Sequence, residues 1–390
     1  MLTKNINFKS FLIKSKNKNI KKIFYNLKKD YILGKEKMLI SLSEDYKYGF
    51  RKKLIKKYKK FNNFRIIGMG GSILGAEAIY DFLKFKIKKK FIFINNLNPI
   101  IKKKEKKIKA LNIIISKSGN TLETILNSNA LVSNNKNVFI TENKNSYLIN
   151  LANSLKAEVF EHKNYIGGRY SVLSEVGMVP AYLMGLNILR FRKNLANHFK
   201  TENKKFLKDS SIMLANLFED NKFKNLIFFN YVPKLHKFLY WSQQLIAESL
   251  GKKGKGFLPL ISKAPKDNHS LLQLYLDGPK DKFFTFFNSS EKEKKFKVSK
   301  NIIPENMKFL KNKNLKFIIN AQCDAVKNVF RLKKIPYRQI TFSKKNEEEL
   351  GEIFTFFALE TILLSRLMNV NPFDQPAVEQ VKTETKKILR

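Results

Sequence analysis

The sequence passes from an apolar run directly into a glycine-rich turn at residues 64–75, which read FRIIGMGGSILG. The run has the length and β-branched content of a buried strand, and the residues after the turn have the spacing of an amphipathic helix. Further along the chain, short apolar runs continue to alternate with helical stretches. Strands separated by helices in this way predict a parallel sheet in a doubly wound α/β domain.

The alternation predicts two rounds of strands and helices. The first round has strands at 64–69, 91–95, 111–116, 137–141 and 157–161, and helices at 75–86, 121–133, 145–155 and 171–190. The second round has strands at 225–230, 283–288, 315–320 and 338–342, and helices at 234–250, 322–332 and 347–368. The charged run 290–300 between two of these strands is predicted to be a solvated loop.

We therefore expect an α/β protein with two doubly wound domains, each a parallel sheet flanked by helices. The expected divisions are an N-terminal helical segment at 1–60, a first domain at 61–190, a helical connection at 191–222, a second domain at 223–370 and a C-terminal helix at 371–390. Pro376 suits the first turn of that last helix, where its missing N–H would have no helical partner in any case.

Charge is the unusual property of the composition. The 390 residues include 76 lysines and arginines against 32 aspartates and glutamates, which gives a formal net charge of +44. Such a charge is typical of a nucleic-acid or anionic-membrane binder. However, only nine of the basic residues are arginines, the side chain that grips phosphate and guanine with two parallel bonds. Lysine occurs here with abundant Asn, Ile and Phe, which all have A/T-rich codons, so we expect neither nucleic acid nor a membrane as a partner.

Cysteine and histidine usage narrows the chemistry. Cys323 is the only cysteine, so no internal disulfide can form and a reducing compartment is expected. The lysine-rich start of the chain lacks the apolar core of a secretory signal, and no apolar stretch is long enough to span a membrane. The four histidines, His162, His198, His236 and His269, lack metal-ligand spacing. We expect a cytoplasmic protein that needs no metal and no other cofactor.

Two turns carry the residue types of an anion site. The first contains Gly71 and the hydroxyl of Ser72, but it lacks the third glycine of a dinucleotide fingerprint and the lysine of a Walker loop. The second, at 116–121, reads SKSGNT and opens a predicted helix. Adjacent parallel strands would place both turns at one edge of the sheet, where hydroxyls and helix N-termini suit a phosphate. Taken singly, each turn is also compatible with an ordinary helix cap.

Three further segments place polar residues in apolar surroundings: GGRYSVLS at 167–174, QLIAESLGK at 244–252, and KDNHS at 266–270, which contains His269. Together with the two turns and with NPFDQPAVE at 371–379, these motifs resemble the phosphoglucose isomerase family, whose domains are of the sugar isomerase (SIS) type. The resemblance runs in the expected order from about residue 65 to residue 382. It implies an aldose–ketose isomerase that interconverts glucose 6-phosphate and fructose 6-phosphate through ring opening and an enediolate.

The resemblance also implies a role for each matching residue. The residues that would hold the sugar phosphate are Gly71, Ser72, Ser116, Lys117, Ser118 and Thr121. Glu248 would be the base that moves a proton between C2 and C1, and Arg169 would face the enediolate. His269 and Lys382 would open the sugar ring, and Gln375 would contact the substrate. The family's site is shared between two subunits of a homodimer, and the neighbour contributes the histidine.

Some positions depart from the family pattern, and two alternatives stay open. Residues 264–268 read APKDN where many members have a Gly/Asn-rich turn, Leu250 replaces a common Asn, and Ala377 replaces a common Gly. One alternative is a bifunctional isomerase that also accepts mannose 6-phosphate. The other is a non-catalytic SIS sensor of phosphosugars, although a sensor would not need Glu248, Arg169 and His269 together.

Overall fold

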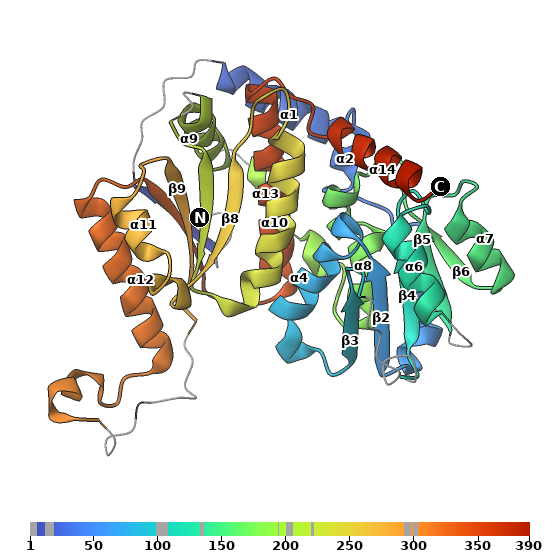
Figure 1. The fold of residues 1–390 in the computed structure, drawn as a ribbon, viewed down its shortest axis with the longest axis horizontal. Coiled ribbons are helices and arrows are strands. Elements are labelled where there is room, and N and C mark those ends of the chain that lie inside the picture. Colours follow the sequence, from blue (N-terminus) through green and yellow to red (C-terminus); the bar gives the residue numbers. More distant parts are fainter. Residues whose placement is uncertain are drawn as a thin grey trace.

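The computed structural model describes residues 6–11, 19–98, 108–132, 136–193, 195–199, 206–219, 222–291, 298 and 303–390. They form two five-stranded sheets, and the helices α10 (His236–Leu250) and α13 (Glu347–Leu367) lie between these sheets (Figure 1). The predicted α/β fold with two sheets is confirmed. Within the described part of the chain, no helix combines the length and the hydropathy that a membrane crossing requires.

The first sheet is entirely parallel, with the strand order β3-β2-β4-β5-β6. Its strands are β2 (Asn63–Gly68), β3 (Lys90–Ile94), β4 (Leu111–Ile115), β5 (Asn137–Thr141) and β6 (Glu158–Glu161). All five predicted strands of this domain are confirmed. The direction of winding reverses between β2 and β4, and in open α/β sheets the crevice at the carboxyl ends of such a strand pair is the usual ligand site.

The helices of the first sheet agree with the prediction except at one place. They are α4 (Leu74–Phe82), α6 (Leu122–Leu131), α7 (Tyr147–Ser154), the 3₁₀ helix η4 (Gly168–Leu173) and α8 (Glu175–Leu183). The single helix predicted at 171–190 is wrong, because Ser174 adopts an extended conformation and separates η4 from α8. Gly185, at a φ of 88°, lies just beyond the end of α8.

The second sheet has the order β1-β10-β9-β7-β8. Its parallel strands are β7 (Asn225–Asn230), β8 (Leu258–Lys263), β9 (Lys282–Ser289) and β10 (Tyr337–Phe342). The edge strand β1 (Ile6–Phe11) is antiparallel to β10 and corrects two expectations, an all-parallel sheet and a purely helical segment at 1–60. Strand β8 was also not predicted; it contains Pro259, which an edge strand tolerates since one side of it has no ladder partner.

The strand predicted at 315–320 is wrong. These residues form the first turns of α12 (Leu315–Leu332), and the side chain of Asn314 accepts the N–H of Lys316 at 2.8 Å as a helix cap. The apolar run continues with a helical period through Cys323, Val326 and Phe330, which are buried against the sheet. A short apolar run does not by itself distinguish a strand from a helix, and here the residues beyond the run decide.

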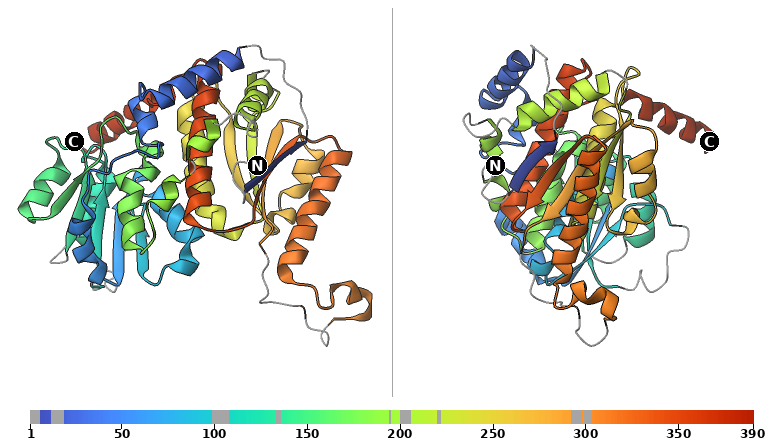
Figure 2. Two further views of the ribbon diagram at one scale, coloured as in Figure 1. Left: turned by 180° about the vertical axis from the view of Figure 1, so that it is seen from behind. Right: turned by 90° about the vertical axis from the view of Figure 1, so that its left-hand side faces the viewer.

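The remaining elements complete the two layers around each sheet. They are α1 (Ile20–Ile32), α2 (Lys37–Ile40), α3 (Lys52–Lys56), α9 (Phe206–Glu219), α11 (Leu272–Asp277), α14 (Pro376–Ile388) and the 3₁₀ helices η1 (Lys57–Lys60), η2 (Gly70–Ser72), η3 (Lys84–Lys86), η5 (Arg190–Arg192), η6 (Leu195–Phe199), η7 (Pro233–Leu235), η8 (Lys266–Asn268) and η9 (Glu305–Leu310). Most of the loop predicted at 290–300 lies outside the described residues. Helix α14 begins at Pro376 and runs along the outside of the molecule with no buried residue of its own (Figure 2).

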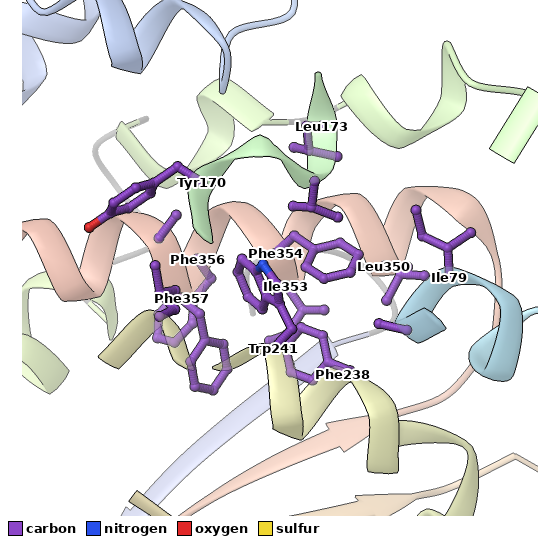
Figure 3. Packing of buried hydrophobic residues seen from close by; sticks show 14 of the residues in the cluster. Ile79, Tyr170, Leu173, Phe238, Trp241, Leu350, Ile353, Phe354, Phe356 and Phe357 are labelled. Atoms are coloured by element: carbon purple, nitrogen blue, oxygen red, sulfur yellow. The ribbon is translucent and has the colours of Figure 1, made fainter. Parts of the chain in front are cut away.

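The core is centred on α13, which is buried along nearly its whole length. Figure 3 shows its aromatic side chains against Phe238 and Trp241 of α10 and against Leu173 of η4. The ring of Trp241 stands edge-on to that of Phe354, with 4.7 Å between the ring centroids. The face of α10 that carries Trp241 is thus held in the core, so its neighbouring polar residues have fixed positions.

Candidate active site

A cavity of about 420 Å³ lies at the carboxyl edge of the first sheet, bordered by α10 and by the start of α14. Among its lining residues are nine that the sequence predicted: Gly71, Ser72, Lys117, Ser118, Thr121, Arg169, Glu248, Gln375 and Lys382. The other lining residues are Met69, Glu142, Lys144, Gly168, Gln244 and Glu379. Residues separated by more than 300 positions in the sequence therefore converge at the switch point between β2 and β4.

The two turns form one wall of the cavity and depend on glycine. A Cβ at Gly71 would lie 2.2 Å from the carbonyl carbon of Gly168, so only glycine lets the first turn approach the segment that carries Arg169. Gly119 has a φ of 68°, and a Cβ there would lie 2.2 Å from the hydroxyl of Ser146. Both glycines therefore determine the shape of the wall.

The second turn is stabilised by its own hydroxyls. Ser116 is 1% exposed and lies beneath the cavity surface, where its hydroxyl is 2.9 Å from that of Thr121. The hydroxyl of Ser118 accepts the N–H of Asn120 at 3.2 Å. The ammonium of Lys117 donates to the carbonyl of Asn164 at 2.8 Å, and burial lowers its pKa. At this turn the cavity surface therefore consists of the hydroxyls of Ser118 and Thr121 and the residue Lys117.

Arg169 has the most hydrogen bonds of the predicted residues. Its Nε donates to Ser249 at 2.9 Å, and one terminal nitrogen, Nη2, donates to the carbonyls of Pro372 and Asp374 at 2.5 and 2.9 Å. The other terminal nitrogen, Nη1, donates to Glu248 at 3.2 Å and to Gln375 at 3.0 Å. Its side chain is only 3% exposed. The guanidinium therefore links η4, α10 and the start of α14 in one fixed arrangement.

Both carboxylate oxygens of Glu248 are held by donors. Arg169 donates to Oε2 at 3.2 Å, and Gln244, one turn earlier on α10, donates to Oε1 at 2.9 Å. The side chain of Glu248 remains 28% exposed on the cavity side. The amide oxygen of Gln244 is buried and has no hydrogen-bond partner among the described residues. A carboxylate in this position can reach a bound substrate while its orientation stays defined.

Helix α14 supplies the opposite rim through residues spaced by one turn. Gln375, Glu379 and Lys382 all line the cavity, and Lys382 donates to Glu379 at 2.6 Å. The side chain of Lys382 is 55% exposed. Gln375 immediately precedes the first turn of α14, and Glu379 and Lys382, three residues apart, lie on one face of the helix.

His269 is the one predicted site residue that the structure places away from the cavity. It is exposed, follows η8 in the second domain, and is not among the described residues that line the cavity. Ser116 also does not line it, but its hydroxyl supports Thr121 from below. Within a single chain the structure therefore does not bring His269 to Lys382.

Two charged residues of the cavity were not predicted from the sequence. Glu142 and Lys144 follow β5, which lies next to β4 in the sheet, and both line the cavity. Charged residues in a loop of a lysine-rich chain have no periodic pattern. The usable signal was topological: the loop after β5 lies at the same carboxyl edge as the two predicted turns.

The fold and the cavity define an SIS-type α/β protein whose site combines hydroxyl-rich turns, a buried arginine and a carboxylate. The model of the family described as phosphoglucose isomerase matches residues 35–256. The chain belongs to the phosphoglucose isomerase family.

Named relatives agree with this assignment. The chain is 34% identical to a glucose-6-phosphate isomerase of Methanocaldococcus jannaschii, with 84% of each protein covered. It is also 34% identical to a glucose-6-phosphate isomerase of Campylobacter jejuni, with 86% of each covered. Among solved structures, a glucose-6-phosphate isomerase of Chlamydia trachomatis superposes with a TM-score of 0.76 at 15% identity, covering 99% of this chain and 89% of that one. A hypothetical protein of Thermus thermophilus superposes with a TM-score of 0.82 at 22% identity, with 95% and 94% covered. At these identities the two structures support the fold alone.

Proposed function

We propose that the chain catalyses the reversible isomerisation of glucose 6-phosphate and fructose 6-phosphate. The observation that supports this most directly is the convergence of Glu248, Arg169 and the two hydroxyl-rich turns on one cavity. An isomerase needs a base beside the reacting carbons, a cation at the oxygens and a separate seat for the phosphate. The cavity offers residues of all three kinds.

The phosphate would occupy the wall formed by the two turns. Ser72, Ser118 and Thr121 supply neutral donors, and the N-termini of α4 and α6 are directed toward the same edge of the sheet. Oriented backbone and hydroxyl dipoles suit a dianion without the large desolvation cost of several buried cations. Binding there would direct the sugar carbons toward α10.

Glu248 would transfer the proton. In the open-chain aldose it accepts the proton of C2, the electrons of the broken C–H bond form the C1=C2 double bond, and the π electrons of the C1 carbonyl move to O1 to give the enediolate. Glu248 then returns this proton to C1 while the O2 hydroxyl loses its proton and O1 gains one, so the product is the ketose, the base is regenerated and no redox partner is needed. Arg169, already directed at Glu248, stabilises the negative oxygens of the intermediate. A fixed donor of this type is typically worth about 3–4 kcal/mol to the transition state.

Ring opening would need a second copy of the chain. His269 is exposed and distant from the cavity of its own subunit, which supports its contribution to the site of a neighbour in a homodimer. There it would act with Lys382, which is at the exposed rim. A single, buried cysteine, Cys323, further supports action in a reducing, cytoplasmic compartment.

A coupled assay that converts fructose 6-phosphate to glucose 6-phosphate tests the proposal. Glu248→Gln should lower kcat by at least about a thousandfold, because the amide cannot accept the proton, while calorimetry still shows binding of fructose 6-phosphate. Glu384→Gln is the matched control, since Glu384 is paired with Lys387 within the exposed α14. An inactive wild-type protein, or substantial turnover by Glu248→Gln, would contradict the proposal. The same assay with mannose 6-phosphate distinguishes a bifunctional enzyme.

A further inference from the structure

The third loop at the carboxyl edge of the first sheet has an unexpected charge pattern. It contributes Glu142 and Lys144 to the lining of the cavity. A carboxylate in a cavity for a sugar phosphate is unfavourable by itself, because it repels the dianion. Its contacts show that it acts on the cations around it.

Glu142 joins this loop to the second phosphate turn. Its carboxylate is 3.7 Å from the ammonium of Lys117 and forms a direct ion pair with Lys144. Its backbone N–H donates to the carbonyl of Lys117 at 3.1 Å, and the N–H of Lys144 donates to the carbonyl of Glu142 at 2.9 Å. The side chain of Glu142 is only 11% exposed. The carboxylate is therefore fixed between the two lysines at the phosphate wall.

The two lysines differ in their freedom to move. Lys117 is 33% exposed and is held by a second acceptor, the carbonyl of Asn164 at 2.8 Å. Lys144 is 55% exposed, and Glu142 is the ion-pair partner that the structure gives it. The ammonium of Lys144 is solvent-exposed, and Glu142 keeps the ammonium of Lys117 at 3.7 Å when Lys144 leaves, so the carboxylate is not left without a cation. Lys144 is thus the cation of this wall that can turn toward an incoming anion.

We propose that Lys144 is a further substrate-binding residue, whose ammonium leaves Glu142 and pairs with the phosphate of the bound sugar. In the absence of substrate this ammonium pairs with Glu142, which therefore competes with the phosphate for it. The inference rests on the proposed function, since it assumes that the phosphate occupies the wall formed by the two turns. It adds a mobile cation to a phosphate wall that otherwise consists of hydroxyls, backbone groups and the held Lys117.

Direct binding measurements test this inference. Calorimetric titration of Lys144→Gln should show a dissociation constant about tenfold weaker than wild type, both for fructose 6-phosphate and for inorganic phosphate, equivalent to about 1.4 kcal/mol. Lys144→Arg should restore most of the affinity. Lys57→Gln is the matched control, because Lys57 is 54% exposed, is paired with Glu158 and does not line the cavity.

Three outcomes would overturn it. One is a Lys144→Gln protein whose dissociation constants equal those of Lys57→Gln. Another is a Glu142→Gln protein that binds inorganic phosphate tenfold more weakly, since removing the competing carboxylate should leave affinity equal or better. A third is a loss in Lys144→Gln that appears in kcat and leaves KM unchanged, because a phosphate contact made equally in ground and transition states affects KM. Wild-type protein that binds fructose 6-phosphate without isomerising it would contradict the proposed function alone.

Discussion

The substitution Arg169→Lys distinguishes two roles of the buried arginine, its contribution to catalysis and its contribution to stability. The substitution keeps the positive charge but replaces a planar fork by a single ammonium. The guanidinium donates five hydrogen bonds, to Ser249, Glu248, Gln375 and the carbonyls of Pro372 and Asp374. An ammonium has three N–H groups, so at least two of these acceptors lose their donor.

The expected losses follow from that difference. Each buried acceptor left without a donor costs roughly 1–3 kcal/mol, so with two such acceptors the free energy of unfolding should fall by about 2–6 kcal/mol. The cation would also no longer be fixed beside the base, so kcat should fall by about a hundred- to a thousandfold, equivalent to about 3–4 kcal/mol of transition-state stabilisation. Urea unfolding measures the first quantity, and the coupled assay with fructose 6-phosphate measures the second under conditions where the variant is folded.

Arg338→Lys is the control for burial alone. Arg338 is fully buried in the second domain, where it forms a bidentate pair with Glu360 at 2.5 and 3.0 Å and also donates to Thr285. Its replacement should reduce stability by a similar amount but leave the kcat of folded protein near the wild-type value. If Arg169→Lys loses stability but keeps kcat within threefold of wild type, the assignment of Arg169 to the enediolate is wrong.

Three further predictions concern the turn, a buried histidine and the last helix. Gly119→Ala should raise KM several-fold and lower stability by about 1–2 kcal/mol, because a Cβ at position 119 would lie 2.2 Å from the hydroxyl of Ser146 and the φ of this residue is 68°. A variant with wild-type KM and stability would contradict this prediction. Burial lowers the pKa of His162 from 6.5 to about 4, so the unfolded chain binds more protons between these values and the free energy of unfolding should fall as pH is lowered through this window, by about 3 kcal/mol at most. His162→Phe should flatten that slope in urea titrations at pH 4 to 7, and an unchanged slope would exclude His162 as its source. Removal of residues 376–390 should change the unfolding free energy by less than about 1 kcal/mol, because α14 has no buried residue. The same truncation should abolish most activity because it removes Lys382, and full activity of the truncated protein would refute the role of this rim.

The first domain could be predicted from the sequence because local and tertiary signals agree there. Most of its strands are apolar runs bounded by polar residues, and stretches with a helical period follow the strands at 64–69, 111–116 and 137–141. The second domain could not be predicted as well. The segment 315–320 has the apolar content of a strand, and β8 contains a proline, so the local signals pointed away from the final structure.

Much of the site was also predictable, for a topological reason. Parallel strands that are neighbours in a sheet end at the same edge, so the turns at 68–75 and 116–121 had to be close if the sheet formed. The loop that carries Glu142 and Lys144 obeys the same rule. It was not recognised because nothing in its residue types distinguishes it from the many charged loops of this chain.

The sequence by itself determined the α/β class, the two phosphate-type turns and the identity of the candidate catalytic and binding residues. These features depend on local residue patterns and on motifs. Only the tertiary structure decided which of those residues meet. Arg169 contacts Gln375 at 3.0 Å across 206 positions of sequence, whereas His269 lies away from the cavity that contains Glu248. Such meetings depend on how α10 and α13 pack the two sheets together, and this packing is the sum of many non-local contacts that no short stretch of sequence encodes.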